Sequence, residues 1–312
     1  MRYCQRALAI AEAGGLEEYG AFARCSLTHV SVVAGDLRGA IAAGRQALAV
    51  FERHGNLWWA CRTLWGLSMA FNAIGDWNRS LECCTQALSH GENLRDLRLR
   101  VVGRFRTGST HILRGDPHTG LKYCEEALAL SSSVPFDTAM IKAVRALGLV
   151  KIGNVASGIA DMEEAMAWFE RSKLRYTRSF VALWLAETCL RHGDHRRARA
   201  LVDEVLAISR AIGYRHLEGV ATRLLGELLI ETEPAAAAEH VTSALVILGE
   251  VGARNDVAKT LVARAALRRA SGAIHDARGL LETALKMFDE QGTLDELART
   301  RASLAADPRD AR

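Results

Sequence analysis

The sequence predicts an all-helical protein, built as an array of repeated antiparallel helix pairs. The helix formers Ala, Leu, Arg and Glu dominate the composition, and the 312 residues include only 4 prolines. Strand-rich folds need frequent turn residues and β-branched or aromatic runs, whereas aromatic residues make up 6% of this chain. In addition, two short motifs recur at a spacing of about 40 residues, which indicates a repeat architecture.

The first recurring motif is an Ala-Leu pair or a close variant of it. It occurs at Ala7-Leu8, Ala47-Leu48, Ala87-Leu88, Ala127-Leu128, Ala165-Met166, Val205-Leu206, Ala244-Leu245 and Ala284-Leu285. The second motif is a turn about twelve residues before each pair from the second onward. These turns are Gly35-Asp36, Gly75-Asp76, Gly115-Asp116, Gly153-Asn154, Gly193-Asp194, Glu233-Pro234 and Gly272-Ala273. Because two independent markers share one period, we divide the chain into repeats at the turns.

Each period predicts two helices. In the second helix of the first full repeat, 36–53, Leu37, Ile41, Leu48 and Phe51 recur every three to four residues and form one apolar face. The partner helices, for example 58–74 and 176–191, are each closed by Gly-Asp, where the Gly ends one helix and the Asp caps the next. The pairs His54-Gly55 and His90-Gly91 are also expected to end helices.

Small residues recur at fixed positions in both helices of the pair. Antiparallel helices approach closely only where Gly, Ala or Ser occupies the crossing point, so these positions are expected to be the crossings. In the second helices they are Ala40, Ser80, Gly120, Gly158, Ala198, Ala237 and Ala277. In the first helices they are Thr28, Ser68, Gly108, Ala146, Ala186 and Ala265.

This pattern resembles the tetratricopeptide repeat over essentially the whole chain. The resemblance implies a right-handed α-solenoid of about seven repeats with a half-repeat at each end, and one superhelical domain spanning 1–312. Its parts would be a half-repeat at 1–16, seven repeats at 17–292, and a capping helix and tail at 293–312. The chain departs from the common pattern in its period, near 40 residues and not 34, and in lacking the usual Pro after the second helix.

The C-terminal segment is expected to cap the array with a polar outer surface, as solenoid ends require. Its leucines, Leu294, Leu297 and Leu304, are expected to face inward. Its charged residues, Asp295, Glu296, Arg299 and Arg301, are expected to face water.

The stretch 231–304 carries a finer resemblance. It is similar to the carboxyl end of bacterial proteins that join a class III adenylate/guanylate cyclase domain to an AAA-type or STAND-type ATPase and then to a tetratricopeptide tail. Residues 252–256 and 292–296 carry most of that similarity. The resemblance implies that this chain is such a tail and that catalytic domains lie upstream of residue 1. The unpaired helix expected at 3–13 favours the same interpretation.

Motifs for catalysis or cofactor binding are missing from the sequence. It has no G-x-x-x-x-G-K-[ST] loop, no G-x-G-x-x-G after a strand and no H-E-x-x-H, so we expect no enzyme activity, no cofactor and no metal. The net charge of +4 is too small to indicate a nucleic-acid partner. The 7 cysteines include no C-x-x-C pair, which favours a reducing, cytoplasmic setting. No apolar stretch is long enough to indicate a membrane span.

The first helices of such solenoids line a concave face, which is the usual binding face. The register places eleven residues on this face or at its edge: Phe22, His29, Arg62, Trp65, Met69, Asn72, Phe105, Ser109, Ile112, Phe180 and Leu183. Aromatic residues beside Arg62, Arg104 and Arg106 suit a groove for an acidic peptide. The alternative, that these aromatics only pack between repeats, stays open.

We therefore expect a non-catalytic protein-interaction or sensor module that binds a protein or peptide in its groove. The resemblance favours the tail of a larger bacterial signalling protein. Two alternatives remain at this point: a free-standing scaffold or peptide receptor, and the effector-sensing tail of an ATPase-linked transcription activator.

Overall fold

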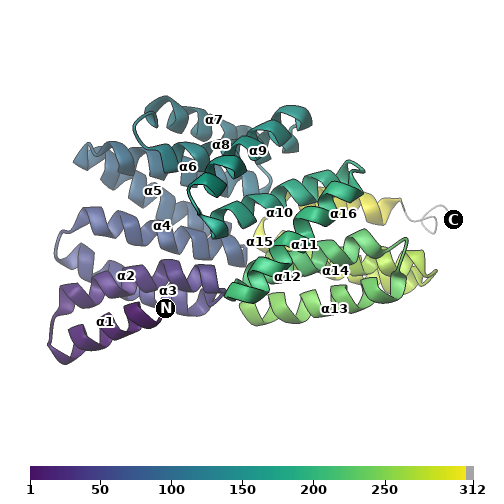
Figure 1. Cartoon of the computed structure of the whole chain (residues 1–312), viewed down its shortest axis with the longest axis horizontal. Helices are drawn as coiled ribbons and strands as arrows, with labels where there is room; N and C mark the ends of the chain where they lie inside the picture. Colours follow the sequence, from purple (N-terminus) through teal and green to yellow (C-terminus); the bar gives the residue numbers. More distant parts are fainter. Residues whose placement is uncertain (307–312) are drawn as a thin grey trace. The chain divides into compact units, whose positions relative to one another are not determined.

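The structure, a computed structural model, describes residues 1–306, and every regular element in that range is an α-helix. The contacts between helices divide the chain into two compact units (Figure 1). Unit 1 comprises Met1–Leu113 and Pro117–Asn154, and unit 2 comprises Arg114–Asp116 and the chain from Val155 onward. The expectation of one superhelical domain stays a prediction, and its last residues, 307–312, lie outside the described part.

Unit 1 holds eight helices: α1 (Arg2–Ala13), α2 (Glu17–Ala34), α3 (Leu37–Arg53), α4 (Leu57–Ile74), α5 (Trp77–Leu94), α6 (Leu97–Arg114), α7 (Pro117–Leu130) and α8 (Pro135–Lys151). The described part of unit 2 also holds eight: α9 (Val155–Arg171), α10 (Arg175–Arg191), α11 (His195–Ile212), α12 (Arg215–Leu229), α13 (Pro234–Val251), α14 (Arg254–Ala270), α15 (Ile274–Gln291) and α16 (Leu294–Ala305).

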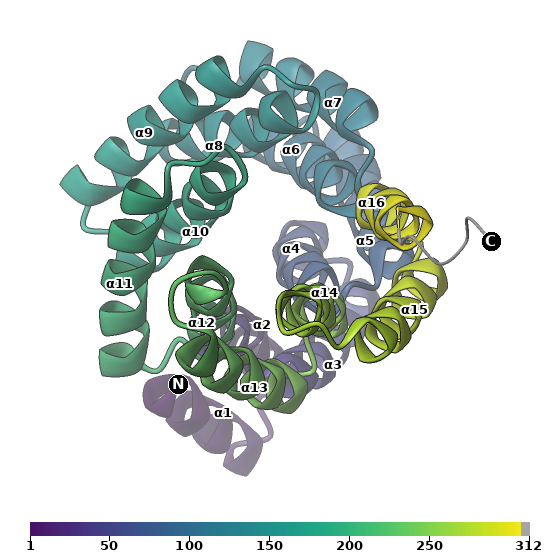
Figure 2. The same ribbon diagram turned by 90° about the vertical axis from the view of Figure 1, so that its right-hand side faces the viewer.

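Neighbouring helices pack as antiparallel pairs, which confirms the predicted fold class. Some even-numbered helices also pack on the next even-numbered helix: α2 on α4, α10 on α12 and α12 on α14. In unit 2, α10, α12 and α14 lie on the inner side of the curve made by α9, α11, α13 and α15 (Figure 2). In unit 1, α6 and α8 likewise lie on the inner side of α7. We therefore call the even-numbered helices inner and the odd-numbered helices outer.

The Gly-Asp turns act as predicted. The Asp36 carboxylate accepts a hydrogen bond from the backbone N–H of Gly39 at 2.9 Å, and Asp194 accepts one from Arg197 at 3.1 Å, so each caps the helix that follows. Gly35 has φ +87°, the left-handed conformation that only glycine adopts without strain. The predicted helix at 36–53 is observed as α3.

The predicted helix crossings are also confirmed. A Cβ on Gly108 of α6 would lie only 2.8 Å from the carbonyl oxygen of Gly120 of α7. The two helices can therefore approach this closely only because Gly108 has no side chain. Ala40 and Ala198 are completely buried at the equivalent positions. Gly226 is a further crossing that was not predicted. It lies seven residues before the turn at Glu233, and a Cβ there would lie 2.7 Å from Val241 Cγ2.

Gly91 does not end a helix, contrary to the prediction. Helix α5 continues to Leu94, and Arg95 takes the left-handed conformation with φ 51°. A Cβ at position 91 would approach Leu99 Cβ to 3.0 Å. Gly91 is therefore small because α6 packs against it, and a glycine in the sequence does not distinguish that role from a helix stop.

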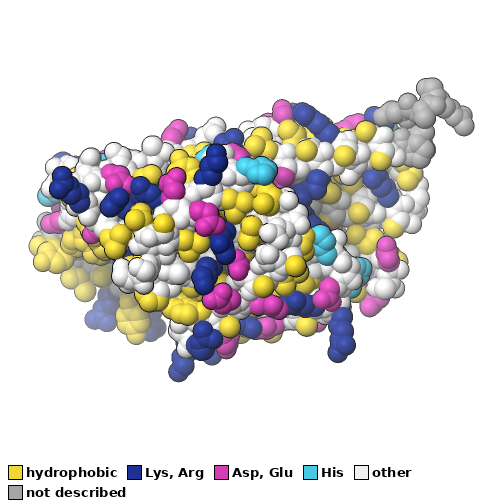
Figure 3. Space-filling model, turned by 90° about the horizontal axis from the view of Figure 1, so that it is seen from above, with side chains coloured by type: hydrophobic (Ala, Val, Ile, Leu, Met, Phe, Trp, Pro, Cys, Tyr) yellow, Lys and Arg dark blue, Asp and Glu magenta, His cyan; other side chains and the backbone are white. Residues whose placement is uncertain are grey.

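Basic and acidic side chains are interspersed over the face seen in Figure 3. Several form ion pairs between one repeat and the next. Arg215 contacts Glu250 at 3.0 Å and Arg254 contacts Glu290 at 3.0 Å, with partners 35 and 36 residues apart. Exposed pairs of this kind add little stability, about 0–1 kcal/mol each.

None of the helices in the described part of the chain combines the length and the apolar character that crossing a bilayer requires.

Candidate functional site

The inner helix α4 of unit 1 carries four of the predicted groove residues in one line. Arg62, Trp65, Met69 and Asn72 follow one another at intervals of three and four residues, so they share one face of the helix. We call this set the α4 stripe. Trp65 is only 5% exposed, and the Arg62 guanidinium lies 5.7 Å from the ring centroid of Trp59.

Three polar atoms of the α4 stripe are buried and unpaired. Within the described residues, Arg62 Nε, Trp65 Nε1 and Asn72 Oδ1 have no hydrogen-bond partner. Leaving such an atom buried and unpaired costs about 1–3 kcal/mol. The stripe therefore presents two donors and one acceptor beside an indole ring, an arrangement suited to a peptide backbone and a carboxylate.

His29 of α2 lies next to the α4 stripe. A Cβ on Gly66 of α4 would lie 3.0 Å from His29 Cε1, and His29 Nδ1 donates to the carbonyl oxygen of Cys25 at 3.0 Å. Burial lowers the pKa of His29; the charges of Arg62 and Arg106 lower it further, and the hydrogen bond to Cys25 opposes them. His29 is therefore neutral at pH 7, and the positive charge beside the α4 stripe comes from Arg62 and Arg106.

Two predicted residues of unit 1 pack between helices. The Phe22 ring lies 5.3 Å from Phe51 and 4.8 Å from Trp59, measured between centroids, in an apolar cluster of α2, α3 and α4. Ile112 is fully buried at the crossing of α6 with α7, where a Cβ on Gly120 would lie 2.5 Å from its Cγ1.

Two further predicted residues follow α6. Phe105 is 1% exposed, with the Arg106 guanidinium 4.9 Å from its ring centroid, and Ser109 is buried one turn later.

The last two predicted residues belong to unit 2. Phe180 of α10 lies 4.7 Å from Trp184 and 6.3 Å from Tyr176 between ring centroids, and Leu183 is buried on the same helix. The eleven predicted residues are thus divided between the two units, and their assignment to a groove stays a prediction.

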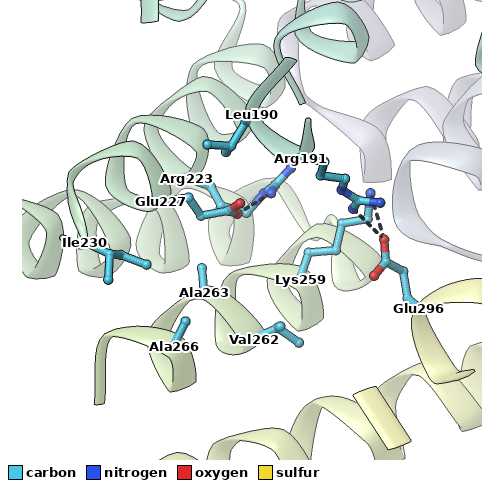
Figure 4. A pocket seen from close by; sticks show the side chains of 10 residues that line it. All are labelled: Leu190, Arg191, Arg223, Glu227, Ile230, Lys259, Val262, Ala263, Ala266 and Glu296. Atoms are coloured by element: carbon cyan, nitrogen blue, oxygen red, sulfur yellow. Dashed lines mark hydrogen bonds and ion pairs between the residues drawn. The ribbon is translucent and has the colours of Figure 1, made fainter. Parts of the chain in front are cut away.

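Unit 2 has a pocket of about 280 Å³ on its inner helices (Figure 4). One part of its wall is apolar: Leu190, Ile230, Val262, Ala263 and Ala266. The other part is charged: Arg191, Arg223, Glu227, Lys259 and Glu296. These side chains come from α10, α12, α14 and α16 or, for Ile230, from the end of α12.

Arg223 is the most deeply buried charge of this pocket, at 2% exposure. Its Nη1 contacts Glu227 at 2.5 Å and its Nη2 contacts Glu187 at 3.3 Å. Burial disfavours the charge, but Glu227 and Glu187 outweigh burial and raise the pKa of Arg223. Its Nε has no hydrogen-bond acceptor among the described residues.

Glu296 of α16 reaches the same group of charges. Its carboxylate contacts Arg191 at 3.2 Å, Lys259 at 3.7 Å and Arg299 at 2.5 Å (Figure 4 shows the first two). Burial raises the pKa of Glu296, but the charges of Lys259, Arg191 and Arg299 outweigh it and lower the pKa to about 2. The carboxylate is therefore ionised at any physiological pH.

Glu296 corrects the prediction for the C-terminal cap. It was expected to face water but is 8% exposed, whereas Leu294, expected to face inward, is 42% exposed. Leu297 and Leu304 do pack on α14 and α15, as expected. No local pattern indicates this role of Glu296, since its partner Arg191 is 105 residues away along the chain.

No protein-family model and no curated protein matches the sequence. Solved structures do match the fold. A Rap protein complexed with competence and sporulation factor is 15% identical with a TM-score of 0.70, over 91% of this chain and 80% of that one. NprR in complex with its cognate peptide NprX is 11% identical with a TM-score of 0.62, over 92% and 85%.

A third structure joins this fold to an ATPase. It is a Signal Transduction ATPase with Numerous Domains (STAND) protein with a tetratricopeptide repeat sensor from Pyrococcus horikoshii, 15% identical with a TM-score of 0.51. The match covers 95% of this chain and 45% of that one. The fold is a tetratricopeptide-like solenoid. At these identities the likeness concerns the fold, and the site must be argued from this chain's own residues.

Proposed function

We propose that this chain is a non-catalytic binding module that holds a peptide or protein segment on the inner helices of unit 1 and serves as a sensor. The observation that carries the proposal is the α4 stripe, where Arg62, Trp65 and Asn72 keep buried polar atoms without partners on an inner helix. Two solved structures of similar fold are complexes, with competence and sporulation factor and with the peptide NprX, which supports this class of ligand.

The stripe supplies the groups that an extended segment needs. Trp65 Nε1 donates to a peptide carbonyl oxygen, and Asn72 Oδ1 accepts from a peptide N–H. Arg62 has no carboxylate partner among the described residues and is suited to an acidic side chain of the ligand. Buried aromatic and arginine anchors are the residues that usually dominate such interfaces.

We further propose that the module is the sensor tail of a larger bacterial signalling protein, in which a bound segment biases an attached effector domain. The match to the sensor-containing STAND protein supports this version. A reading frame that stays open upstream of the Met1 codon and encodes an ATPase or cyclase domain is the expected finding. A stop codon and ribosome-binding site directly ahead of Met1 would favour the free-standing receptor instead.

Selection of random decapeptides displayed on phage against the purified chain tests the binding function. The best selected peptide is then titrated by fluorescence anisotropy against Arg62→Gln and Asn72→Ala, with Arg38→Gln as the control. Arg38 is exposed on the outer helix α3 and leaves the stripe untouched.

We expect each stripe variant to weaken binding by about tenfold, since one hydrogen bond to a buried or charged group is lost, and the control to bind like the parent. The proposal fails if no peptide is enriched, or if the selected peptides bind both stripe variants as tightly as the parent while all variants keep their helical circular dichroism.

A further inference from the structure

The charged end of the unit 2 pocket contains one carboxylate that α16 supplies. The cations Arg191, Arg223 and Lys259 face the carboxylates of Glu187, Glu227 and Glu296. Glu187 and Glu227 lie on α10 and α12, within the stacked inner helices, but Glu296 comes from the last helix. Asp256 also acts on Arg223 and Lys259. Without α16, Arg191 and Lys259 would lose the Glu296 carboxylate, and an incoming carboxylate would take its place.

Polar contacts hold α16 on this face. The buried side chains of α16 are Glu296 and Thr300, and both are polar. Thr293, just before the helix, donates a hydrogen bond to Asn255 Oδ1 of α14 at 3.0 Å. The apolar contacts of α16 come from the half-buried Leu297 and Leu304. A helix attached in this way is removed at a smaller free-energy cost than one anchored by several buried aliphatic side chains.

The pocket itself has room beside the carboxylate. Its apolar wall, formed by Leu190, Ile230, Val262 and two alanines, adjoins Arg191 and Lys259 (Figure 4). At the charged end, the Nε of the buried Arg223 has no acceptor among the described residues. A ligand that matches both parts carries an aliphatic group next to a carboxylate.

We propose that the unit 2 pocket binds a carboxylate of an acidic peptide, next to an aliphatic residue of that peptide, and that Glu296 occupies the carboxylate's place in the unbound protein. The α16 helix is then a displaceable cap, and ligand binding competes with an intramolecular ion pair. This inference rests on the proposed function for the class of ligand, a peptide, and locates a second binding position in unit 2.

Parallel selections of random decapeptides on the parent chain and on Glu296→Gln test the site. The matched control is Glu290→Gln, which removes an exposed carboxylate that pairs with Arg254. We expect Glu296→Gln to enrich peptides with Asp or Glu beside an aliphatic residue. The best of them should bind this variant about tenfold more tightly than the parent or the control, because its intramolecular competitor is gone.

Three comparisons test whether the tighter binding comes from a carboxylate of the peptide in the place of Glu296. Replacing the acidic residue of the selected peptide by its amide should abolish the gain, and so should adding Lys259→Gln to Glu296→Gln. Amidated and free C-termini of the same peptide distinguish a side-chain carboxylate from a terminal one. In the parent chain, saturating peptide should increase hydrogen–deuterium exchange within 294–305, where α16 loses its contacts.

The proposal is overturned if selected peptides lack acidic residues, if Glu296→Gln and Glu290→Gln bind them alike, or if exchange within 294–305 is unchanged at saturation. In those cases peptides still bind and the proposed function stands. If no chain enriches any peptide, the proposed function and this inference both fail.

Discussion

The α4 stripe of unit 1 and the pocket of unit 2 differ in how their polar side chains are paired. In unit 1, Arg62, Trp65 and Asn72 keep buried polar atoms unpaired within the described residues. In unit 2, Arg191 and Lys259 are neutralised by carboxylates of the same unit, one of them from the terminal helix. The α4 stripe therefore keeps polar atoms that lack a protein partner, whereas in the unit 2 pocket a ligand would have to replace a carboxylate already present.

The largest expected effect comes from removing the most buried charge of unit 2. Arg223→Met leaves Glu227 without its ion-pair partner, whereas Glu187 keeps Arg191 and Lys259. Removing one partner of a buried pair destabilises by about 3–5 kcal/mol. The matched change in unit 1, Arg62→Met, breaks no ion pair and should cost less than about 1 kcal/mol. Urea unfolding monitored by circular dichroism measures both. Equal losses for the two variants would contradict the comparison.

A smaller effect is expected from pH. The pKa of Glu296 is lowered from 4.5 to about 2, so its contribution to stability is full above the unfolded-state value and is lost as pH falls towards 2. Between pH 6 and pH 3 this amounts to about 2 kcal/mol. The free energy of unfolding, measured at both pH values, should fall less for Glu296→Gln than for the parent. A parallel fall in both chains would show that Glu296 is not the titrating group.

An effect of similar size, on binding, is expected from the aromatic anchor of unit 1. Trp65→Ala should weaken binding of the selected peptide by about 2 kcal/mol if the indole is a hot spot. Trp184→Ala, which removes a half-buried tryptophan from α10 of unit 2, is the control and should leave this affinity unchanged. The measurement is anisotropy titration corrected for the folded fraction. Loss of folding without selective loss of binding would mean that Trp65 only packs.

The smallest effect is expected for an exposed ion pair. Arg254→Gln breaks the contact with Glu290 between two helices of unit 2, and both side chains are about half exposed. Exposed pairs contribute little, so the free energy of unfolding should fall by less than about 0.5 kcal/mol, and this difference should vanish in 1 M salt. Thermal unfolding with and without salt measures it. A loss as large as that of Arg223→Met would show that burial does not decide the strength of these pairs.

The repeat could be predicted because its signals are local. The cap of Asp36, the left-handed Gly35 and the close Gly108–Gly120 crossing each depend on residues within one helix pair, and each recurs at one period. Stacking of such units follows from the same period. The stripe on α4 could also be found, since helical spacing alone puts Arg62 and Asn72 on one face.

The charged site of unit 2 could not be predicted in the same way. Glu296 lies between exposed and half-buried residues of an amphipathic helix, and such a glutamate is normally solvated. Its partners Arg191 and Lys259 come from two other repeats, so their convergence depends on how strongly the stack curves. Gly91 shows the same limit on a smaller scale, because its neighbour Leu99 belongs to the next helix pair.

The contact between Arg191 and Glu296 also limits how the array can change in length. The two residues stand at the first and last inner helices of unit 2, with two helix pairs, α11–α12 and α13–α14, and the outer helix α15 between them. Duplicating or deleting one 40-residue repeat in that interval, the usual route by which solenoids grow and shrink, would move Glu296 by a whole repeat and separate the pair. This contact can therefore form only with the present number of repeats between α10 and α16.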